Sequence, residues 1–277
     1  ENPVLVSSSD GVGTKLKIAF LSDTHNTIGQ CPVNHCTNVI LAVGARPLFF
    51  LDYFATGKLS IETIEQVVEG LAVACKENST VLIGGETAEM PDFYQEGKYD
   101  ISGTSIRVVD KKYMMPTRKT NKSNLLVGLP STGLHTNGYS LVREVYRLEE
   151  EPSPLAEFRP ELGETLGEAL LRPHPPYYHS LTPAFGHVKG IAHITGGGLV
   201  ENVPRMLPDG TAASFDTDAW PLPPIFSLIQ EDGGIQRDEM YRVFNMGLGM
   251  VLVCDPSTVD RVLELVPDSL VVGKVVE

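Results

Sequence analysis

Segments of strand character alternate with segments of helical period along almost the whole chain, and this alternation constrains the fold more than any other feature. Strands are predicted at residues 4–8, 48–54, 81–83, 101–109, 125–129, 191–194, 249–254 and 269–276. Helices are predicted at residues 33–43, 61–75, 141–148, 164–171 and 259–266. The pattern predicts an α/β (α+β) fold of two α/β halves, with a mixed sheet and helices in the C-terminal half.

A polar, basic stretch around Pro116 separates the two halves. It contains Lys111, Lys112, Arg118, Lys119, Asn121 and Lys122. We interpret it as a hinge between residues 1–115 and residues 116–277, with phosphate binding as the alternative. Because the chain begins and ends on strands, we also expect it to be a piece of a longer protein.

The charge balance limits the class of partner. The 277 residues include 22 Lys and Arg against 35 Asp and Glu, which gives a formal net charge of −13. Such a surface repels phosphodiester backbones and anionic lipids, so we expect neither nucleic acid nor a membrane as the main partner. With no signal peptide or apolar run of membrane-spanning length, we expect a cytoplasmic protein.

The four cysteines form no CxxC pair, and Cys75 and Cys254 lie in apolar runs that predict buried thiols. Cys31 and Cys36 flank His35 in a group that a metal could use. We do not favour a metal site there, because no second ligand pair stands at the spacing of a zinc finger.

Two glycine-containing strings lie in the first half. In the first, Gly11 and Gly13 let backbone amides approach an anion, Thr14 and Lys15 add polar contacts and charge, and Asp10 is suited to Mg²⁺. The string lacks the spacing of a Walker phosphate loop, and an ordinary turn is the alternative.

The second string, Gly84-Gly85-Glu86, follows a strand predicted to be buried. Open α/β sheets bind ligands at that edge, so Glu86 is a candidate ligand. A glutamate that caps a helix or faces solvent is the alternative.

Two further strings lie in the second half. His135 stands in a glycine-containing loop with Asn137 and Ser140, which are side chains suited to phosphate or proton transfer, although a loop histidine can be purely structural. The run from Thr195 through Gly196 and Gly197 to Gly198 opens a predicted helix, whose N-terminus can bind an anion. His193 precedes this run inside a strand, and we interpret it as a core residue.

Taken together, these strings resemble phosphoribosylformylglycinamidine cyclo-ligase, also called aminoimidazole ribonucleotide synthetase. The resemblance runs in order from Pro3 to Val276 and rests on residues 9–15, 47–53, 84–91, 137–143, 195–198 and 239–245. It implies phosphorylation of the amide oxygen of formylglycinamidine ribonucleotide by ATP, followed by ring closure and loss of phosphate. It also implies a homodimer in which strands of the N-terminal half form a shared barrel.

The resemblance further implies roles for individual residues. Asp10 and Glu86 would hold Mg²⁺, and His135 would handle a proton or phosphoryl group, with Asp10 and Lys15 beside it in catalysis. ATP would contact Gly11, Gly13, Thr14, Lys15, Gly84, Gly85 and Glu86. The phosphorylated ribonucleotide would contact Asn137, Ser140, Thr195, Gly196, Gly197 and Gly198.

The match breaks at four positions. Cys31 and Val39 stand where the resemblance places acids, Asn26 replaces a common aspartate, and Arg107 replaces a small glycine. Loss of a carboxylate at Val39 would lower the rate on the order of 100-fold if that position binds magnesium or ATP. The alternatives are therefore a weakened homologue that binds nucleotide or a phosphorylated ligand without turnover, and another ATP-using enzyme of the same superfamily.

Overall fold

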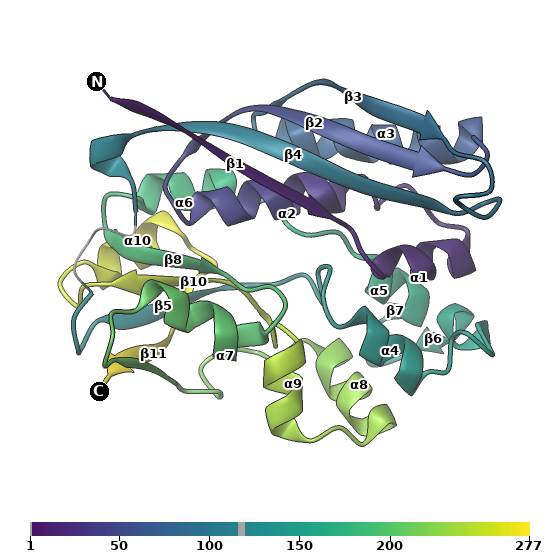
Figure 1. Ribbon diagram of the computed structural model, residues 1–277. Coiled ribbons are helices and arrows are strands. Elements are labelled where there is room, and N and C mark those ends of the chain that lie inside the picture. The colour runs from purple at the N-terminus through teal and green to yellow at the C-terminus, as the bar shows by residue number, and fades with distance from the viewer. Residues whose placement is uncertain (1, 116–119) are drawn as a thin grey trace.

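The computed structural model describes residues 2–115 and 120–277 and contains two main sheets with helices between and around them (Figure 1). The α/β fold of two halves that the sequence predicts is confirmed. The first sheet has the strand order β1-β4-β2-β3, the second has the order β8-β10-β5-β11-β9, and β6 (Phe158–Arg159) pairs with β7 (Glu164–Thr165). Residues 116–119 of the predicted hinge, which include Pro116, Arg118 and Lys119, lie outside the described residues.

The first sheet consists of β1 (Pro3–Gly11), β2 (Arg46–Thr56), β3 (Val81–Glu89) and β4 (Tyr99–Asp110). Strand β4 pairs antiparallel with β1 and β2, while β2 and β3 are parallel. The predicted burial of β3 is wrong, because β3 is an edge strand and the side chains of Val81 and Ile83 are 58% and 56% exposed. Gly84, Gly85 and Glu86 lie inside this strand, not in a loop after it.

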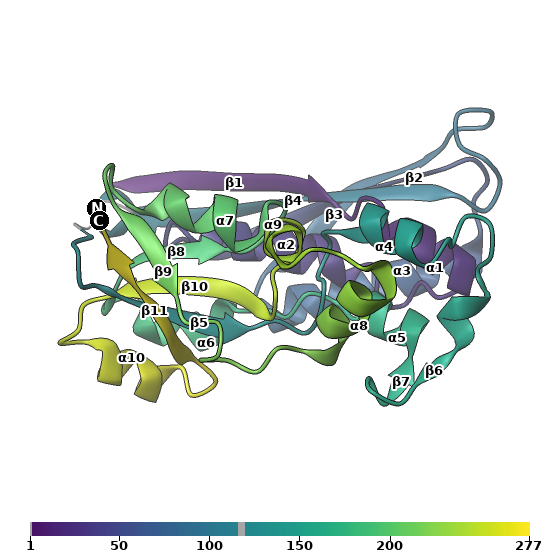
Figure 2. The ribbon, with the colours of Figure 1, turned by 90° about the horizontal axis from the view of Figure 1, so that it is seen from below.

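Helices cover one face of the first sheet (Figure 1). They are α1 (Lys15–Ser22), α2 (Gln30–Leu41) and α3 (Ile61–Glu77). The helix predicted after Ser60 is confirmed, and its first turn is capped by the Ser60 hydroxyl, which accepts a hydrogen bond from the amide of Thr63. Helix α2 contacts β1 and β4 on one side and β8 on the other, so it lies between the two sheets (Figures 1 and 2).

The second sheet consists of β5 (Leu125–Pro130), β8 (Val188–His193), β9 (Ala212–Phe215), β10 (Leu248–Cys254) and β11 (Leu270–Val276). Each described pair of neighbouring strands in this sheet is antiparallel. The mixed sheet that was expected in the C-terminal half is found in the first half, where β2 and β3 are parallel. Strand β10 is buried along its whole length because it is paired on both sides and covered on both faces.

The helices of the second half are short. They are α4 (Tyr139–Val145), α5 (Leu166–Leu171), α6 (Tyr178–Leu181), α7 (Gly198–Asn202), α8 (Pro224–Gly233), α9 (Arg237–Val243) and α10 (Val259–Leu265). Single 3-10 turns lie at Lys111–Tyr113, Ser153–Ala156, Thr182–Ala184 and Val203–Met206. Among the described residues, none of the helices is both long enough and apolar enough to cross a membrane.

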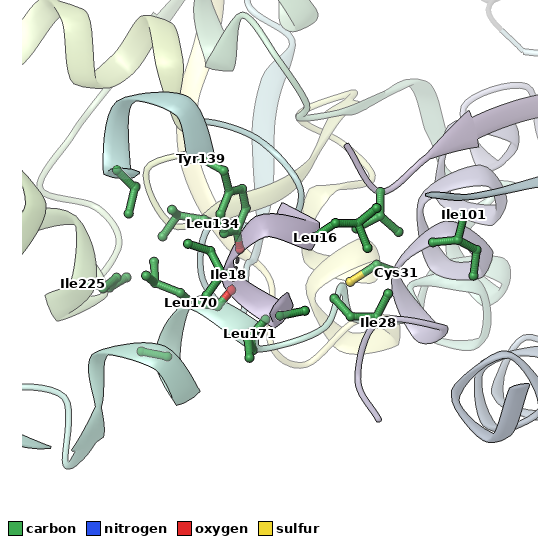
Figure 3. Packing of buried hydrophobic residues seen from close by; sticks show 14 of the residues in the cluster. Leu16, Ile18, Ile28, Cys31, Ile101, Leu134, Tyr139, Leu170, Leu171 and Ile225 are labelled. Atoms are coloured by element: carbon green, nitrogen blue, oxygen red, sulfur yellow. Dashed lines mark hydrogen bonds between the residues drawn. The ribbon is translucent and has the colours of Figure 1, made fainter. Parts of the chain in front are cut away.

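The largest hydrophobic core is shared by the two halves. Leu16 and Ile18 of α1 pack in one buried cluster with Leu134, Tyr139 and Leu170 of the second half (Figure 3). The Tyr139 hydroxyl donates to the carbonyl of Leu170, which satisfies the one polar atom of this large buried ring. The halves are therefore packed as one body, and the loops at their strand ends face one another.

Candidate functional site

Three of the four strings singled out in the sequence meet between the two sheets. The Lys15 ammonium donates to the main-chain carbonyl of His135 over 3.2 Å, which joins the first string to the third. A Cβ atom at Gly196 would lie 3.3 Å from the Asn137 side-chain oxygen, so the third and fourth strings also touch. Strand ends from both halves thus deliver their glycine loops to one place.

An aspartate–histidine pair lies at the start of this site. Asp10 Oδ2 is 2.8 Å from His35 Nε2, and Asp10 Oδ1 accepts a hydrogen bond of 2.8 Å from the amide of Gly11. The hydrogen bond from His35 is the main cause that lowers the pKa of Asp10, against an opposing effect of partial burial. Asp10 is thus ionised near neutral pH, and its half-exposed carboxylate has the chemistry of a Mg²⁺ ligand.

The hydrogen bonds continue from this pair into the second half. His35 Nδ1 lies 3.3 Å from the Thr136 hydroxyl, which in turn lies 3.1 Å from His174 Nε2. The ring of His174 packs 4.2 Å from the ring of His135 and 5.5 Å from that of His193, measured between centroids. Four histidine rings from separate parts of the chain therefore form one cluster.

Burial keeps three of these rings neutral. It lowers the pKa of His135 to about 3, with smaller contributions from the nearby Lys15 and His35. It also lowers the pKa of His174 and of His193 well below the usual histidine value. Because an imidazole with so low a pKa is unprotonated at neutral pH, none of the three rings carries a positive charge there.

The segment that carries His174 is held by amide side chains of α2. Asn34 donates to the His174 carbonyl over 2.6 Å, and Asn38 donates to the Pro175 carbonyl over 3.0 Å. Asn38 Oδ1 also accepts from the amide of Tyr177 at 3.2 Å. Positions four residues apart lie on one face of a helix, so one side of α2 fixes the backbone of this proline-rich segment.

The role expected for Lys15 needs correction. Its ammonium is fully buried and donates to Cys31 Sγ at 3.3 Å as well as to the carbonyls of His135 and Arg172. Burial lowers the pKa of Lys15, and the neighbouring Cys31 partly opposes this. With three protein acceptors and no exposed surface, Lys15 connects α1 to the second half and does not face a phosphate. Thr14 and Gly13, in contrast, are exposed.

Glu86 lies apart from the other candidates. In the first sheet Asp10, Gly103, Asp52 and Gly85 form one row of cross-strand neighbours, so Glu86 points to the opposite face from Asp10. Three strand spacings also separate them, roughly 14 Å. One ion therefore cannot bridge Asp10 and Glu86 within a single chain, and Glu86 is solvent-facing here.

The fourth string is ordered by a single amide. The Asn202 side chain donates to the carbonyls of Thr195, Gly196 and Gly198, and its oxygen lies 3.2 Å from the Thr195 hydroxyl. Gly198 needs to be glycine, because its φ is 56° and a Cβ there would lie 2.1 Å from the carbonyl of Tyr241 in α9. Ser140, the remaining substrate candidate, is exposed in the first turn of α4.

Family models match both halves of the chain, and curated proteins match up to all of it. The N-terminal domain of the AIR synthase related proteins matches residues 1–109, and their C-terminal domain matches residues 121–277. Phosphoribosylformylglycinamidine cyclo-ligase of Thermoanaerobacter sp. (strain X514) is 49% identical over 282 residues, covering 100% of this chain and 84% of the relative. The protein of the same name from Desulfitobacterium hafniense (strain DSM 10664 / DCB-2) is 50% identical, covering 93% and 76%. The chain belongs to the phosphoribosylformylglycinamidine cyclo-ligase family.

Solved structures of other proteins share the fold of this cyclo-ligase family member. Thiamine-monophosphate kinase from Stenotrophomonas maltophilia K279a aligns with a TM-score of 0.72 at 18% identity, covering 100% of this chain and 84% of the kinase. Phosphoribosylformylglycinamidine synthase II from Thermotoga maritima aligns with a TM-score of 0.66 at 15% identity, covering 100% and 41%. At such identities the likeness concerns the fold alone.

The positions at which this chain departs from the cyclo-ligase resemblance differ in environment. Cys31 is buried against the Lys15 ammonium, whereas Val39 is 37% exposed on α2. Arg107 is fully buried on β4, where Nη1 donates to the carbonyl of Ala45 over 3.1 Å and the guanidinium lies 5.3 Å from the Tyr178 ring centre. Burial lowers the pKa of Arg107 to about 10.

Sequence reasoning missed three members of the site: His35 as a partner of Asp10, and Thr136 and His174 as the link to the second half. His35 was interpreted only with its neighbouring cysteines, and no role was predicted for Thr136 or His174. The signal available in the sequence was that His174 lies in a segment too rich in proline to form regular structure. Such loops often carry functional residues. His193 is buried, as expected, although its ring nitrogens lack a hydrogen-bond partner among the described residues.

Proposed function

We propose that this protein catalyses the ATP-dependent ring closure of formylglycinamidine ribonucleotide to aminoimidazole ribonucleotide, releasing ADP and phosphate, as a cytoplasmic enzyme of purine biosynthesis. The observation that carries the proposal is identity of 46–49% to curated cyclo-ligases over 97–100% of the chain. The convergence of Asp10, Asn137 and Gly196 at one place supports it, because nucleotide and ribonucleotide must meet for phosphoryl transfer.

ATP use has independent support from the fold. Solved proteins of this fold include one complexed with ADP and another complexed with AMPPCP, with TM-scores of 0.64 and 0.69. In this chain the exposed Gly13 and Thr14, next to Gly11, offer main-chain amides and a hydroxyl to an incoming phosphate. Because Glu86 points to the opposite face of the sheet from Asp10, the expected contact of Gly84, Gly85 and Glu86 with this nucleotide is not part of the proposal.

Asp10 is the proposed Mg²⁺ ligand. Its carboxylate is ionised and half exposed, which suits an ion that retains waters and binds through one or two carboxylates and the phosphates. When bound, Mg²⁺ neutralises charge on the phosphoryl group during transfer. His35 holds the Asp10 carboxylate in place by donating to Oδ2.

The substrate loops are proposed to act by positioning. Asn137, Ser140 and the run Thr195–Gly198 hold the ribonucleotide, and Asn202 keeps that run in shape. With a pKa of about 3, the His135 ring is too weak a base for proton transfer near neutral pH. We propose that His135 instead orders its loop through its carbonyl, which accepts from both Lys15 and Tyr139.

A homodimer is proposed from the uncovered face of the first sheet. The helices cover only one face (Figure 1), and Leu5 and Val81 on this sheet are 71% and 58% exposed. Light scattering of the purified protein should give the mass of two chains, and Leu5→Glu should give one. Val200→Glu on α7 is the matched control, since Val200 is 55% exposed away from the sheet.

Release of ADP that depends on formylglycinamidine ribonucleotide tests the catalytic proposal. We expect release by the unchanged protein, a loss of at least about 100-fold in Asp10→Asn, and no change in Asp260→Asn on the surface of α10. Nucleotide binding without ADP release would instead favour the weakened homologue.

A further inference from the structure

Three buried histidines lie close enough together to share one ligand. One ring nitrogen from each of His135, His174 and His193 lies within 4.8 Å of the others. The three residues come from the loop after β5, the segment before α6, and the end of β8. Both ring nitrogens of His135 and of His193, and Nδ1 of His174, have no hydrogen-bond partner among the described residues.

Unpartnered buried nitrogens of this kind require an explanation. Most buried polar atoms in proteins make at least one hydrogen bond, and leaving such an atom unsatisfied costs free energy. Five unpaired ring nitrogens in one place are more than packing alone explains. The unpartnered nitrogens therefore indicate a ligand that is not part of the protein chain.

The hydrogen bonds behind His174 hold one of its ring nitrogens and leave the other to the cluster. The ionised Asp10 can only accept, so His35 Nε2 donates to it, and His35 Nδ1 lies 3.3 Å from the Thr136 hydroxyl. That hydroxyl lies 3.1 Å from His174 Nε2, while His174 Nδ1 has no hydrogen-bond partner among the described residues. A metal-binding histidine typically has its second nitrogen held by such a partner.

The backbone around the cluster is fixed in advance. Asn34 and Asn38 of α2 hold the carbonyls of His174 and Pro175. His135 has a φ of 62°, a conformation uncommon for residues other than glycine and one that the surrounding contacts must maintain. Side chains on so constrained a backbone keep their relative positions without a bound ligand.

Charged groups of both signs lie near the cluster. The Asp10 carboxylate connects to it through His35 and Thr136, and the Lys15 ammonium donates to the main-chain carbonyl of His135. The three histidines offer unpartnered ring nitrogens to a cation between them.

We propose that His135, His174 and His193 together bind one Zn²⁺ ion, with water in the fourth position. Imidazole nitrogen suits Zn²⁺ and other late transition metals and is a poor ligand for Mg²⁺. Three histidines with one open position are the ligand set of zinc sites that take part in chemistry. This site is distinct from the Mg²⁺ position proposed at Asp10, whose carboxylate supports the cluster only through His35 and Thr136.

Little movement is needed to form the site. Tetrahedral Zn²⁺ with bonds of about 2.0–2.1 Å needs ligand nitrogens roughly 3.4 Å apart. From a largest separation of 4.8 Å, side-chain rotation of about 1 Å or less at each nitrogen closes the triangle. Thr136, which is hydrogen-bonded to His174, is partly exposed.

The test is zinc binding by the purified protein after chelation and dialysis, in the absence of any nucleotide. We expect one equivalent of Zn²⁺ by competition with a chromophoric chelator, and a visible spectrum typical of four-coordinate Co²⁺ after substitution. His174→Gln and His193→Gln should each weaken binding more than about 100-fold, and Thr136→Val about 10–100-fold. His179→Gln is the matched control, since His179 is hydrogen-bonded to Ser79 on the surface.

Circular dichroism confirms that each variant is folded before titration. Should one histidine variant fail to fold, the other histidine variant and Thr136→Val still decide the question. Equal zinc affinity in the unchanged protein, His174→Gln and His193→Gln would overturn the proposal, as would the absence of binding in the unchanged protein. In that event the ring nitrogens are hydrated. The readout is independent of turnover, so it can fail while the cyclo-ligase proposal holds.

Discussion

Replacing Cys31 by aspartate should stabilise the protein. The Lys15 ammonium is completely buried, and its three acceptors are a sulfur atom and two main-chain carbonyls, none of which carries a formal charge when Cys31 is a thiol. Removing one partner from a buried ion pair typically costs about 3–5 kcal/mol, because a buried charge is left uncompensated. Supplying the missing carboxylate should recover part of that cost, about 2 kcal/mol once its own desolvation is included.

The assay is urea and thermal unfolding of the unchanged protein, Cys31→Asp and Cys31→Asn. A gain of this size should raise the Tm of a protein of this length by about 4–8 °C. Cys31→Asn is the matched control, because the amide has nearly the shape of the carboxylate without its charge. The reasoning is refuted if Cys31→Asp is no more stable than Cys31→Asn.

The pH dependence provides a second check on the same pair. The carboxylate at position 31 would have a folded pKa below its unfolded value of about 3.9, so the added stability is present above that pH and is lost as pH falls through the folded pKa. In the unchanged protein the pKa of Lys15 is lowered from 10.5, so the free energy of unfolding rises as pH rises toward 10.5. That rise should be smaller in Cys31→Asp, because the carboxylate raises the pKa of Lys15.

Three further perturbations test other parts of the structure. Arg107→Met should stabilise the protein by about 1–2 kcal/mol in urea unfolding, because Nε and Nη2 of this buried guanidinium lack partners among the described residues; a loss of stability would contradict this. Val39→Asp should change stability by less than about 0.5 kcal/mol, since the side chain is 37% exposed, but raise ADP release about 100-fold if the position serves the nucleotide; unchanged release would show that it does not. Asp10→Asn should destabilise the protein at pH 7, and the difference should shrink as pH falls below 3.8, because the pKa of Asp10 is lowered by His35; a difference that is constant with pH would argue against this ion pair.

The fold could be predicted from local signals because most elements are specified locally. The helix α3 begins after a capping Ser60 and follows a clear helical period, and the apolar strand β10 is buried as its composition suggests. The same rule failed for β3, whose apolar residues indicated burial. The composition of a strand shows that it is apolar, but it does not show whether another strand of the chain pairs with each of its edges. Strand β3 lies at an edge of its sheet.

The candidate site was predictable only in part. Three of the four glycine strings converge between the two sheets, whereas Gly84 and Gly85 lie inside the edge strand β3. The burial of Lys15 was not predictable, since two of its acceptors are carbonyls more than 100 residues away in the chain. The partnership of Asp10, His35 and His174 was hidden for the same reason. Hydrogen bonds between distant segments leave no periodicity in the sequence.

Helix α2 has a consequence for how the protein unfolds. It covers the first sheet, yet Asn34 and Asn38 hold main-chain atoms of the second half, and Leu16 of α1 is buried there as well. Separating the halves would expose a shared apolar core. It would also leave several buried amide groups without their hydrogen-bond partners. The two halves should therefore melt in one cooperative transition, and neither should fold when expressed without the other. The boundary between the two halves in the sequence is therefore not a boundary between units that unfold independently.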